Sequence, residues 1–253
     1  MRIADQWVLV TGGARGLGAA IVRALAGQGA GVILNYRRSA EAAEALAAEL
    51  GPRVMPMQAD VTDRAALTEL VAEARARSGA PLSALVNNAL ADFRFDGDAR
   101  PRLDDIAWSR FQQQLDGSLK GALNAMQAVL PGMREQGFGR IVNIGTNLFQ
   151  NPVVPYHDYT AAKAALLSLT RTAANDAGPD GITVNMLSGG LLRTTDASGA
   201  TPEAVFELIA GMTPLRRVTT PAEFADAVLF FLSPWARAVT GQDLIVDGGL
   251  VKN

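Results

Sequence analysis

Short runs of β-branched and other apolar residues alternate with longer helical patterns from one end of the chain to the other. A strand followed by a helix, repeated along the chain, is typical of βαβ units, which build a parallel sheet with helices on both faces. The predicted strands comprise residues 7–11, 31–35, 53–58, 83–87, 140–145, 182–188 and 244–246. The predicted helices comprise residues 40–50, 63–78, 108–136, 156–177 and 221–232. We therefore expect an α/β fold with one doubly wound parallel sheet of about seven strands.

The composition narrows the class of protein further. No stretch of the 253 residues reads as a polar linker, so we expect one domain spanning residues 1–253. The formal net charge of -2 argues against nucleic acid or an anionic membrane as a partner. No run reaches the roughly 18 apolar residues of a membrane span, and the N-terminus lacks an apolar signal core, so we expect a cytoplasmic protein. With no cysteine, and His157 as the only histidine, no metal site is expected.

A glycine-rich segment, TGGARGLG at residues 11–18, joins the first predicted strand to an apolar helical pattern. Glycine allows a tight turn and close approach of the backbone to a pyrophosphate, whose charge the N–H groups of a helix N-terminus offset. Its place in the first βαβ unit favours a dinucleotide site over an ordinary Gly-rich turn. The predicted contacts are Gly12, Ala14, Arg15, Gly16, Leu17 and Gly18.

The Thr-Gly-x-x-x-Gly-x-Gly spacing resembles that of the short-chain dehydrogenase/reductase family, and the resemblance covers essentially the whole chain. The later motifs are QADV at 58–61, NNA at 87–89, YTAAK at 159–163 and TGQDLIVDGG at 240–249. The resemblance implies a Rossmann-type fold, a nicotinamide cofactor and a homotetramer. It also implies cofactor contacts from Asp60, Val61, Asn87, Asn88, Ala89, Tyr159, Lys163, Gly190 and Thr194.

The end of the second predicted strand bears on the choice between NAD and NADP. An acidic residue there accepts from the ribose hydroxyls of NAD and repels a 2′-phosphate. The family's NAD-selecting Asp aligns with Tyr36, which is followed by Arg37 and Arg38, and Arg15 adds a basic residue from the glycine loop. These arginines are either a phosphate clamp or solvated surface charges. We predict NADP(H) as the cofactor.

Tyr159 and Lys163 are the predicted catalytic pair. Reduction of a carbonyl needs a proton donor near the developing alkoxide, and tyrosine, with an ordinary pKa of about 10, needs a nearby cation to favour its phenolate. Residues four apart on a helix share a face, so the Lys163 ammonium is expected to depress the tyrosine pKa and to bind a ribose hydroxyl. Tyr156 lacks this partner, because Thr160 stands four residues after it.

Two further predicted catalytic positions depart from the family pattern. Thr146 stands where the family usually has serine, and it retains a hydroxyl that can bind the substrate oxygen. Ser118 stands at the family's catalytic Asn, where it serves either in a proton relay or as a plain helix residue. Gly117 beside it could supply the local distortion that the family's Asn usually brings.

Other departures are Leu90, in place of a glycine, and Ser188-Gly189-Gly190, in place of Pro-Gly. The irregular residues 90–101 and 191–214 follow predicted strands and are interpreted as substrate-site loops. His157 has no role in the family pattern and is interpreted as structural.

The overall pattern is closest to the 3-oxoacyl-[acyl-carrier-protein] reductases. This resemblance implies NADPH-dependent reduction of a 3-oxoacyl thioester to a secondary alcohol. Docking of an acidic acyl carrier protein calls for basic residues beside the pocket, and only Arg134 and Arg171 lie near the expected positions. Reduction of another ketone, a sugar or a quinone, oxidation of the corresponding alcohol, and a non-catalytic NADP(H)-binding role are the alternatives.

Overall fold

The computed structural model describes residues 1–90, 93–193 and 195–252. Within these ranges, seven strands form one parallel sheet in the order β3-β2-β1-β4-β5-β6-β7. Chain order thus runs outward from β1 to one edge and then, after a crossover to β4, outward to the other edge, which is the doubly wound arrangement predicted. The strands are β1 (Trp7–Val10), β2 (Gly31–Tyr36), β3 (Val54–Gln58), β4 (Ala84–Asn87), β5 (Gly139–Thr146), β6 (Ile182–Gly189) and β7 (Asp243–Val246).

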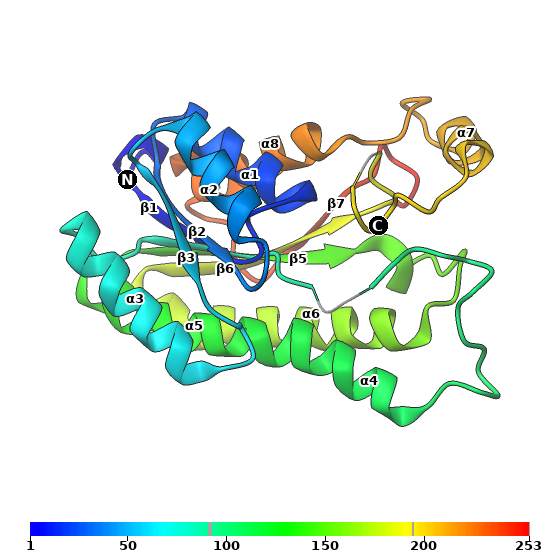
Figure 1. Ribbon diagram of the computed structural model, residues 1–253, viewed down its shortest axis with the longest axis horizontal. Helices are drawn as coiled ribbons and strands as arrows, with labels where there is room; N and C mark the ends of the chain where they lie inside the picture. Colours follow the sequence, from blue (N-terminus) through cyan, green and yellow to red (C-terminus); the bar gives the residue numbers. More distant parts are fainter. Residues whose placement is uncertain (91–92, 194, 253) are drawn as a thin grey trace.

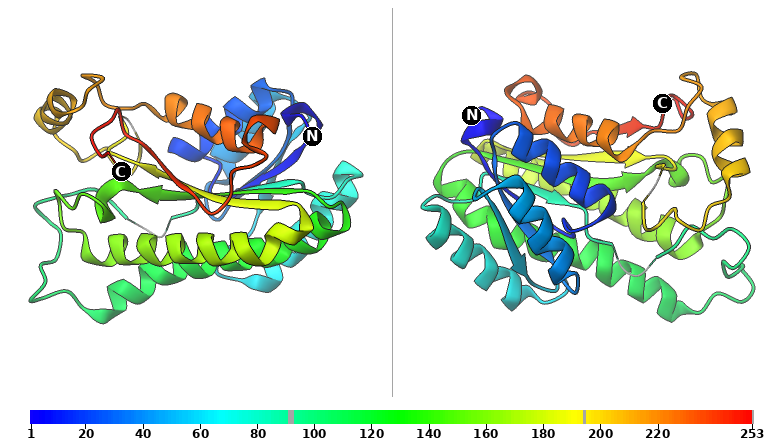
Figure 2. Two further views of the ribbon diagram at one scale, coloured as in Figure 1. Left: turned by 180° about the vertical axis from the view of Figure 1, so that it is seen from behind. Right: turned by 45° about the horizontal axis from the view of Figure 1, so that its top comes forward.

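Helices cover both faces of the sheet, so the predicted α/β class is confirmed (Figure 1). One face carries α1 (Gly16–Gly27), α2 (Ala40–Leu50) and α8 (Pro221–Leu232). The other carries α3 (Arg64–Ser78), α5 (Gly121–Glu135) and α6 (His157–Ala177), and α4 (Trp108–Gln114) packs outside α6. The view from behind and the view with the top tilted forward show the same three layers (Figure 2). None of the described helices is both long and apolar enough to cross a membrane.

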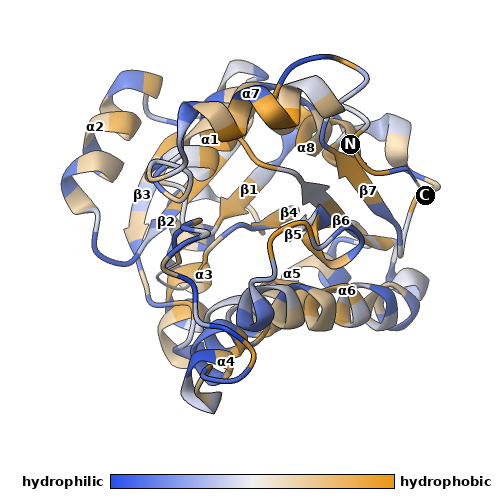
Figure 3. Cartoon of the chain, turned by 90° about the vertical axis from the view of Figure 1, so that its right-hand side faces the viewer, coloured by the Kyte–Doolittle hydropathy of each residue, from blue (hydrophilic) through white to orange (hydrophobic). Residues whose placement is uncertain are grey.

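Alternation along each strand divides the core in two. Val8 and Val10 of β1 are fully buried on the side of α1 and α8, whereas Leu9 between them is buried on the side of α3 and α5. Because successive side chains of a strand point to opposite faces, an apolar run such as Trp7–Val10 fills both layers. Hydrophobic ribbon colours accordingly concentrate along the strands and the helix faces toward them (Figure 3).

Two predicted elements differ from the structure. Residues 108–136 were expected as one helix, but a π-helical segment, Leu115–Lys120, separates α4 from α5. This segment contains Gly117 and Ser118, where the family resemblance implied a distortion. Residues 191–214 were expected to be irregular, but they contain α7 (Glu203–Met212), which buries only Phe206 and leaves Leu208 63% exposed. The residues just before this helix, 193–202, are rich in Thr, Ser, Asp and Gly, which are typical of loops, and they favoured the irregular interpretation.

The carboxyl ends of the strands meet at one edge of the sheet, where ligands of doubly wound proteins bind. Beyond this edge, α7 lies on one side and the segment preceding α4 on the other (Figure 1). Both predicted substrate-site loops thus reach the edge at which the cofactor motifs end.

Candidate active site

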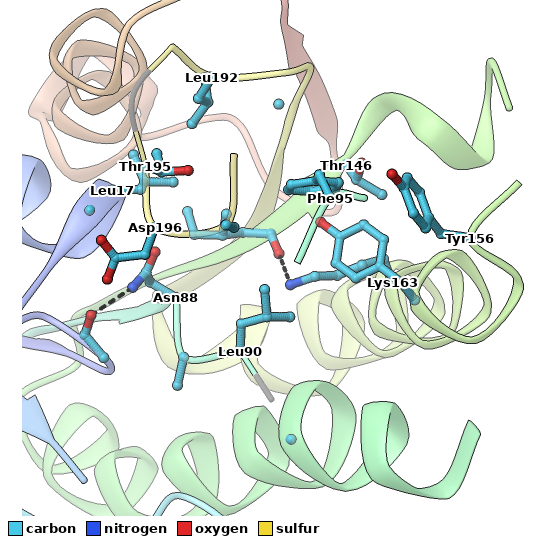
Figure 4. Close-up of a pocket in the computed structure, with 18 of the residues that line it drawn as sticks. Leu17, Asn88, Leu90, Phe95, Thr146, Tyr156, Lys163, Leu192, Thr195 and Asp196 are labelled. Atoms are coloured by element: carbon cyan, nitrogen blue, oxygen red, sulfur yellow. Dashed lines mark hydrogen bonds between the residues drawn. The ribbon is translucent and has the colours of Figure 1, made fainter. Parts of the chain in front are cut away.

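One cavity of about 1040 Å³ opens at the carboxyl ends of the strands. Most of the predicted site residues line it: Gly12, Ala14, Arg15, Gly16, Leu17, Gly18, Tyr36, Arg37, Arg38, Asp60, Val61, Asn88, Ala89, Thr146, Tyr159, Lys163 and Gly190. Two predicted residues, Asn87 and Ser118, do not line it, and Thr194 lies outside the described residues. Figure 4 shows Leu17, Asn88, Thr195 and Asp196 on one side of the pocket and Phe95, Thr146, Tyr156 and Lys163 on the other.

The glycine loop is shaped by close backbone contacts. Gly12 has a φ of +63°, a conformation that L side chains rarely adopt, and a Cβ at Gly18 would lie 2.1 Å from the Gly12 carbonyl oxygen. The Asn88 amide donates to the carbonyl oxygens of Thr11 and Gly12, each at 3.0 Å, so the end of β4 holds the loop in place. Since α1 begins at Gly16, its first N–H groups open on the cavity, where a pyrophosphate fits.

Basic and acidic side chains meet at the end of the cavity formed by β2 and β3. Arg37 Nη1 lies 3.7 Å from Asp60 Oδ2, and Asp60 Oδ1 accepts from the backbone and hydroxyl of Thr62 at 2.9 and 2.8 Å. Burial alone would raise the pKa of Asp60, but the Thr62 hydrogen bonds and the charges of Arg37 and Arg38 outweigh it and lower this pKa. Asp60 is therefore ionised at neutral pH.

Tyr159 and Lys163 of α6 are both buried beside the cavity. Burial raises the pKa of Tyr159 to about 12, although its hydrogen bond with Thr146 acts in the opposite direction. Burial lowers the pKa of Lys163 to about 8. Lys163 Nζ lies 5.9 Å from the centre of the Tyr159 ring and donates to the Ile144 carbonyl oxygen at 2.7 Å (Figure 4).

These values differ from the expectation that Lys163 depresses the tyrosine pKa. The phenol is enclosed by aromatic rings, which penalise its charged form, and the lysine donates to a backbone carbonyl of β5 rather than to the phenol. In this structure the phenol is a protonated donor throughout the neutral range.

Thr146 and Ser118 lie in different surroundings. Thr146 ends β5 and lines the cavity, and its Oγ1 accepts from the backbone N–H of Leu148 at 3.3 Å. Ser118 is buried in the π-helical segment, and its Oγ has no hydrogen-bond partner among the described residues. A buried hydroxyl without a partner is costly, so a water molecule bound there would satisfy it.

Comparison with known proteins places this geometry in a family. A family model described as "Enoyl-(Acyl carrier protein) reductase" matches residues 12–251. The chain belongs to the short-chain dehydrogenase/reductase family. It is therefore an oxidoreductase acting on CH–OH or C=O groups, and the family uses a nicotinamide cofactor. The resemblance noted in the sequence is confirmed.

Similar proteins have several different names. A 3-alpha-(or 20-beta)-hydroxysteroid dehydrogenase of Mycobacterium tuberculosis is 35% identical, over 99% of this chain and 91% of the relative. An acetoacetyl-CoA reductase of Rhizobium meliloti is 36% identical, over 95% and 96% of the two chains. A 3-oxoacyl-[acyl-carrier-protein] reductase of Staphylococcus aureus is 32% identical, over 96% of each.

The Asn87 side chain, which was predicted to contact the cofactor, does not line the cavity of this short-chain dehydrogenase/reductase. Asn87 Nδ2 donates to Asn143 Oδ1 at 2.8 Å, and Asn143 Nδ2 donates to Thr170 Oγ1 at 2.8 Å, all three residues being buried. Asn87 therefore links β4 to β5, and through Asn143 to α6, from behind the cavity.

The sequence alone does not single out Asn35, which also shapes the cofactor end of this short-chain dehydrogenase/reductase. Its buried side chain accepts from the Gly12 N–H at 3.4 Å and donates to the Ala59 carbonyl oxygen at 3.0 Å. Asn35 thereby joins the glycine loop to the end of β3. A polar residue within the apolar strand GVILNY was the available signal.

Phe93 and Phe95 pack against the Tyr159 ring, and Tyr156 packs against both of them; these three rings, Phe93, Phe95 and Tyr156, are called the aromatic wall below. Phe93 stacks on the Tyr159 ring with centroids 4.4 Å apart and planes at 15°, and Phe95 meets the same ring edge-on at 5.6 Å. Tyr156 lies 5.3 Å from Phe93 and 5.7 Å from Phe95. Tyr156 lines the cavity, although the spacing rule in the sequence set it aside.

The C-terminal segment forms another part of the cavity wall. Asp247 accepts from Asn147 Nδ2 at 2.9 Å and from the backbone N–H groups of Gly249, Leu250 and Val251 at 2.9–3.0 Å. Leu250 lines the cavity. Asn147, which follows Thr146, thus helps to hold the C-terminal segment that forms this part of the wall.

Proposed function

We propose that this enzyme reduces a ketone to a secondary alcohol with NADPH, and that Tyr159 is the general acid. The observation that carries the proposal is the protonated, buried Tyr159 phenol, which lines the same cavity as the glycine loop and the arginine-rich end. NADPH supplies the hydride, and the residues named here bind, orient and protonate.

The proton comes from the Tyr159 hydroxyl. As negative charge develops on the ketone oxygen, this hydroxyl transfers its proton and the Thr146 hydroxyl donates a hydrogen bond to the same oxygen. The Lys163 ammonium, charged below its pKa of about 8, stabilises the phenolate that remains. Bulk solvent then returns a proton to the Tyr159 phenolate.

The preference for NADPH rests on the charges at the far end of the cavity. Arg15, Arg37 and Arg38 line it, and Tyr36 occupies the position where an acidic residue would select NAD. Arg15 Nε pairs with Asp196 Oδ2 at 3.2 Å, with both side chains more than 60% exposed. Exposed pairs of this kind are weak, so a 2′-phosphate competes with Asp196 for the arginine.

The proposed substrate is a 3-oxoacyl thioester. Two of the similar proteins are named as reductases of such compounds, and Leu148, Val154, Leu192, Val205 and Ile209 offer the acyl chain an apolar lining. A hydroxysteroid-type ring ketone is the second candidate, because a similar protein carries that name and the cavity is large.

Charge at the cavity argues against a thioester carried on acyl carrier protein. Asp96, Asp98 and Asp116 line the cavity, and their carboxylates repel an acidic partner. Arg134, one of the two basic residues in a suitable position, pairs with Asp180 at 2.8 Å. The homotetramer and the cytoplasmic location stay predictions, the former testable by light scattering.

The test is NADPH oxidation with acetoacetyl-CoA, a 3-oxoacyl carrier-protein thioester and a steroid ketone. Tyr159→Phe should lower turnover by at least about a hundredfold and leave the Kd for NADPH nearly unchanged, because only the acid is removed. Unaltered turnover in this variant would reject the assignment of Tyr159. Binding of NADPH with no turnover of any ketone or alcohol would favour a non-catalytic protein.

A further inference from the structure

The hydroxyl-bearing residues that line the substrate end of the cavity include Thr146, Tyr156 and Tyr159. Two of them act on the ketone oxygen in the proposed function, and the third has no role there. We propose that Tyr156 is a specificity-determining residue whose hydroxyl donates a hydrogen bond to a second oxygen of the substrate, close to the ketone. This inference rests on the proposed function and narrows its substrate class to 1,3-dicarbonyl compounds such as 3-oxo esters and thioesters.

The position of the Tyr156 ring is set by its neighbours. Tyr156 and Tyr159 both pack against Phe93, with ring centroids at 5.3 and 4.4 Å, and both meet Phe95 edge-on. Both tyrosines also line the same cavity, so one ligand bound there can meet both hydroxyls. Figure 4 draws Tyr156 on the same side of the pocket as Thr146.

Backbone hydrogen bonds hold the aromatic wall in place. The N–H of Phe95 donates to the Ala197 carbonyl oxygen at 2.9 Å, which ties the loop before α4 to the loop before α7. Tyr156 donates through its own N–H to Val154 at 3.0 Å and precedes the first residue of α6. A ring fixed in this way aims its hydroxyl with little loss of entropy on binding.

The Tyr156 hydroxyl is available as a donor. The residue is only 7% exposed and lines the cavity, beside the space that a substrate would occupy. Burial, reinforced by Asp96, raises the Tyr156 pKa, so the group keeps its proton at neutral pH. A donor at the wall of a largely enclosed site discriminates between ligands with and without a matching acceptor.

The second oxygen must accept a hydrogen bond and lie near the ketone. The thioester carbonyl of a 3-oxoacyl thioester meets both conditions, since one carbon separates its carbonyl carbon from the ketone carbon. The thioester chain beyond it passes between apolar residues such as Leu192 and Leu250. A lone ketone would leave the Tyr156 hydroxyl unpaired.

The experiment compares two substrates in two variants. Ethyl acetoacetate has a second carbonyl, whereas methyl pentyl ketone has the same chain length and ketone position but lacks it. Tyr156→Phe keeps the ring and its packing and removes only the hydroxyl. We expect kcat/KM for ethyl acetoacetate to fall about three- to tenfold, as for loss of one hydrogen bond, and kcat/KM for methyl pentyl ketone to change by less than about twofold.

Tyr36→Phe is the matched control, because it removes a tyrosine hydroxyl at the opposite end of the cavity. This variant should change kcat/KM for both substrates by the same factor. If methyl pentyl ketone turns over too slowly, its inhibition constant against ethyl acetoacetate replaces kcat/KM. Equal losses on both ketones in Tyr156→Phe, or no loss on either, would overturn the role of Tyr156 while the proposed function stands. If the wild-type enzyme reduces no ketone with NADPH, the proposed function itself fails, and this inference with it.

Discussion

Replacing Lys163 by methionine should abolish activity and make the ligand-free protein more stable. Lys163 is 3% exposed, and burial lowers its pKa from an ordinary 10.5 to about 8. At about 1.4 kcal/mol for each tenfold change, holding the charged ammonium in this site costs about 3 kcal/mol at neutral pH. Methionine has a similar length and carries no charge, so the variant avoids this cost.

One interaction is lost in exchange. Lys163 donates to the Ile144 carbonyl oxygen at 2.7 Å, and removing that hydrogen bond costs about 1 kcal/mol. The net gain at pH 7 is therefore about 2 kcal/mol. For a chain of this size such a gain raises the Tm by about 4–8 °C.

The gain should depend on pH in a definite direction. A lysine whose pKa is lowered on folding is charged in both states below pH 8, where the full cost applies. Between pH 8 and 10.5 the unfolded chain binds more protons than the folded one, so wild-type stability rises with pH. The advantage of Lys163→Met should thus be full at pH 7 and nearly gone above pH 10.

Urea unfolding of the wild type and of Lys163→Met, both without cofactor, gives the difference in their free energies of unfolding at pH 7 and at pH 10. NADPH is left out because a ligand of the folded state would add its own stabilisation. Lys120→Met, at an exposed position, is the matched control and should change stability little. A variant no more stable than wild type at pH 7, or an advantage unaffected by pH, would refute the reasoning.

The remaining predictions concern the buried serine and the cofactor end. Ser118→Ala removes a buried hydroxyl that has no partner among the described residues, so the free energy of unfolding should rise by about 1 kcal/mol. A lower free energy of unfolding for the variant, measured with urea, would mean that bound water already satisfies the Ser118 hydroxyl. In the double variant Tyr36→Asp/Arg37→Ile, the ratio of kcat/KM with NADPH to kcat/KM with NADH should fall by about tenfold or more, so that NADH is favoured. The new carboxylate repels the 2′-phosphate of NADPH. Equal wild-type values with NADH and NADPH would show these arginines to be solvated surface charges.

Local pattern was sufficient for most of the fold. Helices α2 and α8 have the bounds predicted for residues 40–50 and 221–232, because each presents an apolar stripe and ends at a clear signal. Gly51 follows α2, and Thr220 forms a capping box with Glu223 at the start of α8. The strands differ from prediction by a residue or so at their ends, where pairing with neighbours decides the limit.

Elements that depend on distant contacts were harder to predict. The π-helical segment Leu115–Lys120 interrupts a continuous helical pattern, and no pattern of period 3.6 reports an added residue in one turn. Helix α7 follows a stretch rich in Thr, Ser, Asp and Gly, residues typical of loops, and its ten residues bury only Phe206. Asn87 matches a cofactor motif in sequence, yet its side chain bonds with Asn143 of the neighbouring strand.

The sequence by itself determined the doubly wound sheet, the family, and most of the residues that line the cavity. These follow from periodicity and fixed spacing, which are local properties of the chain. Only the tertiary structure decided the protonation of Tyr159 and Lys163, because a pKa depends on burial and on neighbours that come from other segments. It also placed Tyr156 in the substrate pocket, since Phe93 and Phe95, more than 60 residues away in sequence, position its ring. Spacing along a helix identifies which side chains share a face, whereas packing against distant segments decides what each side chain meets there.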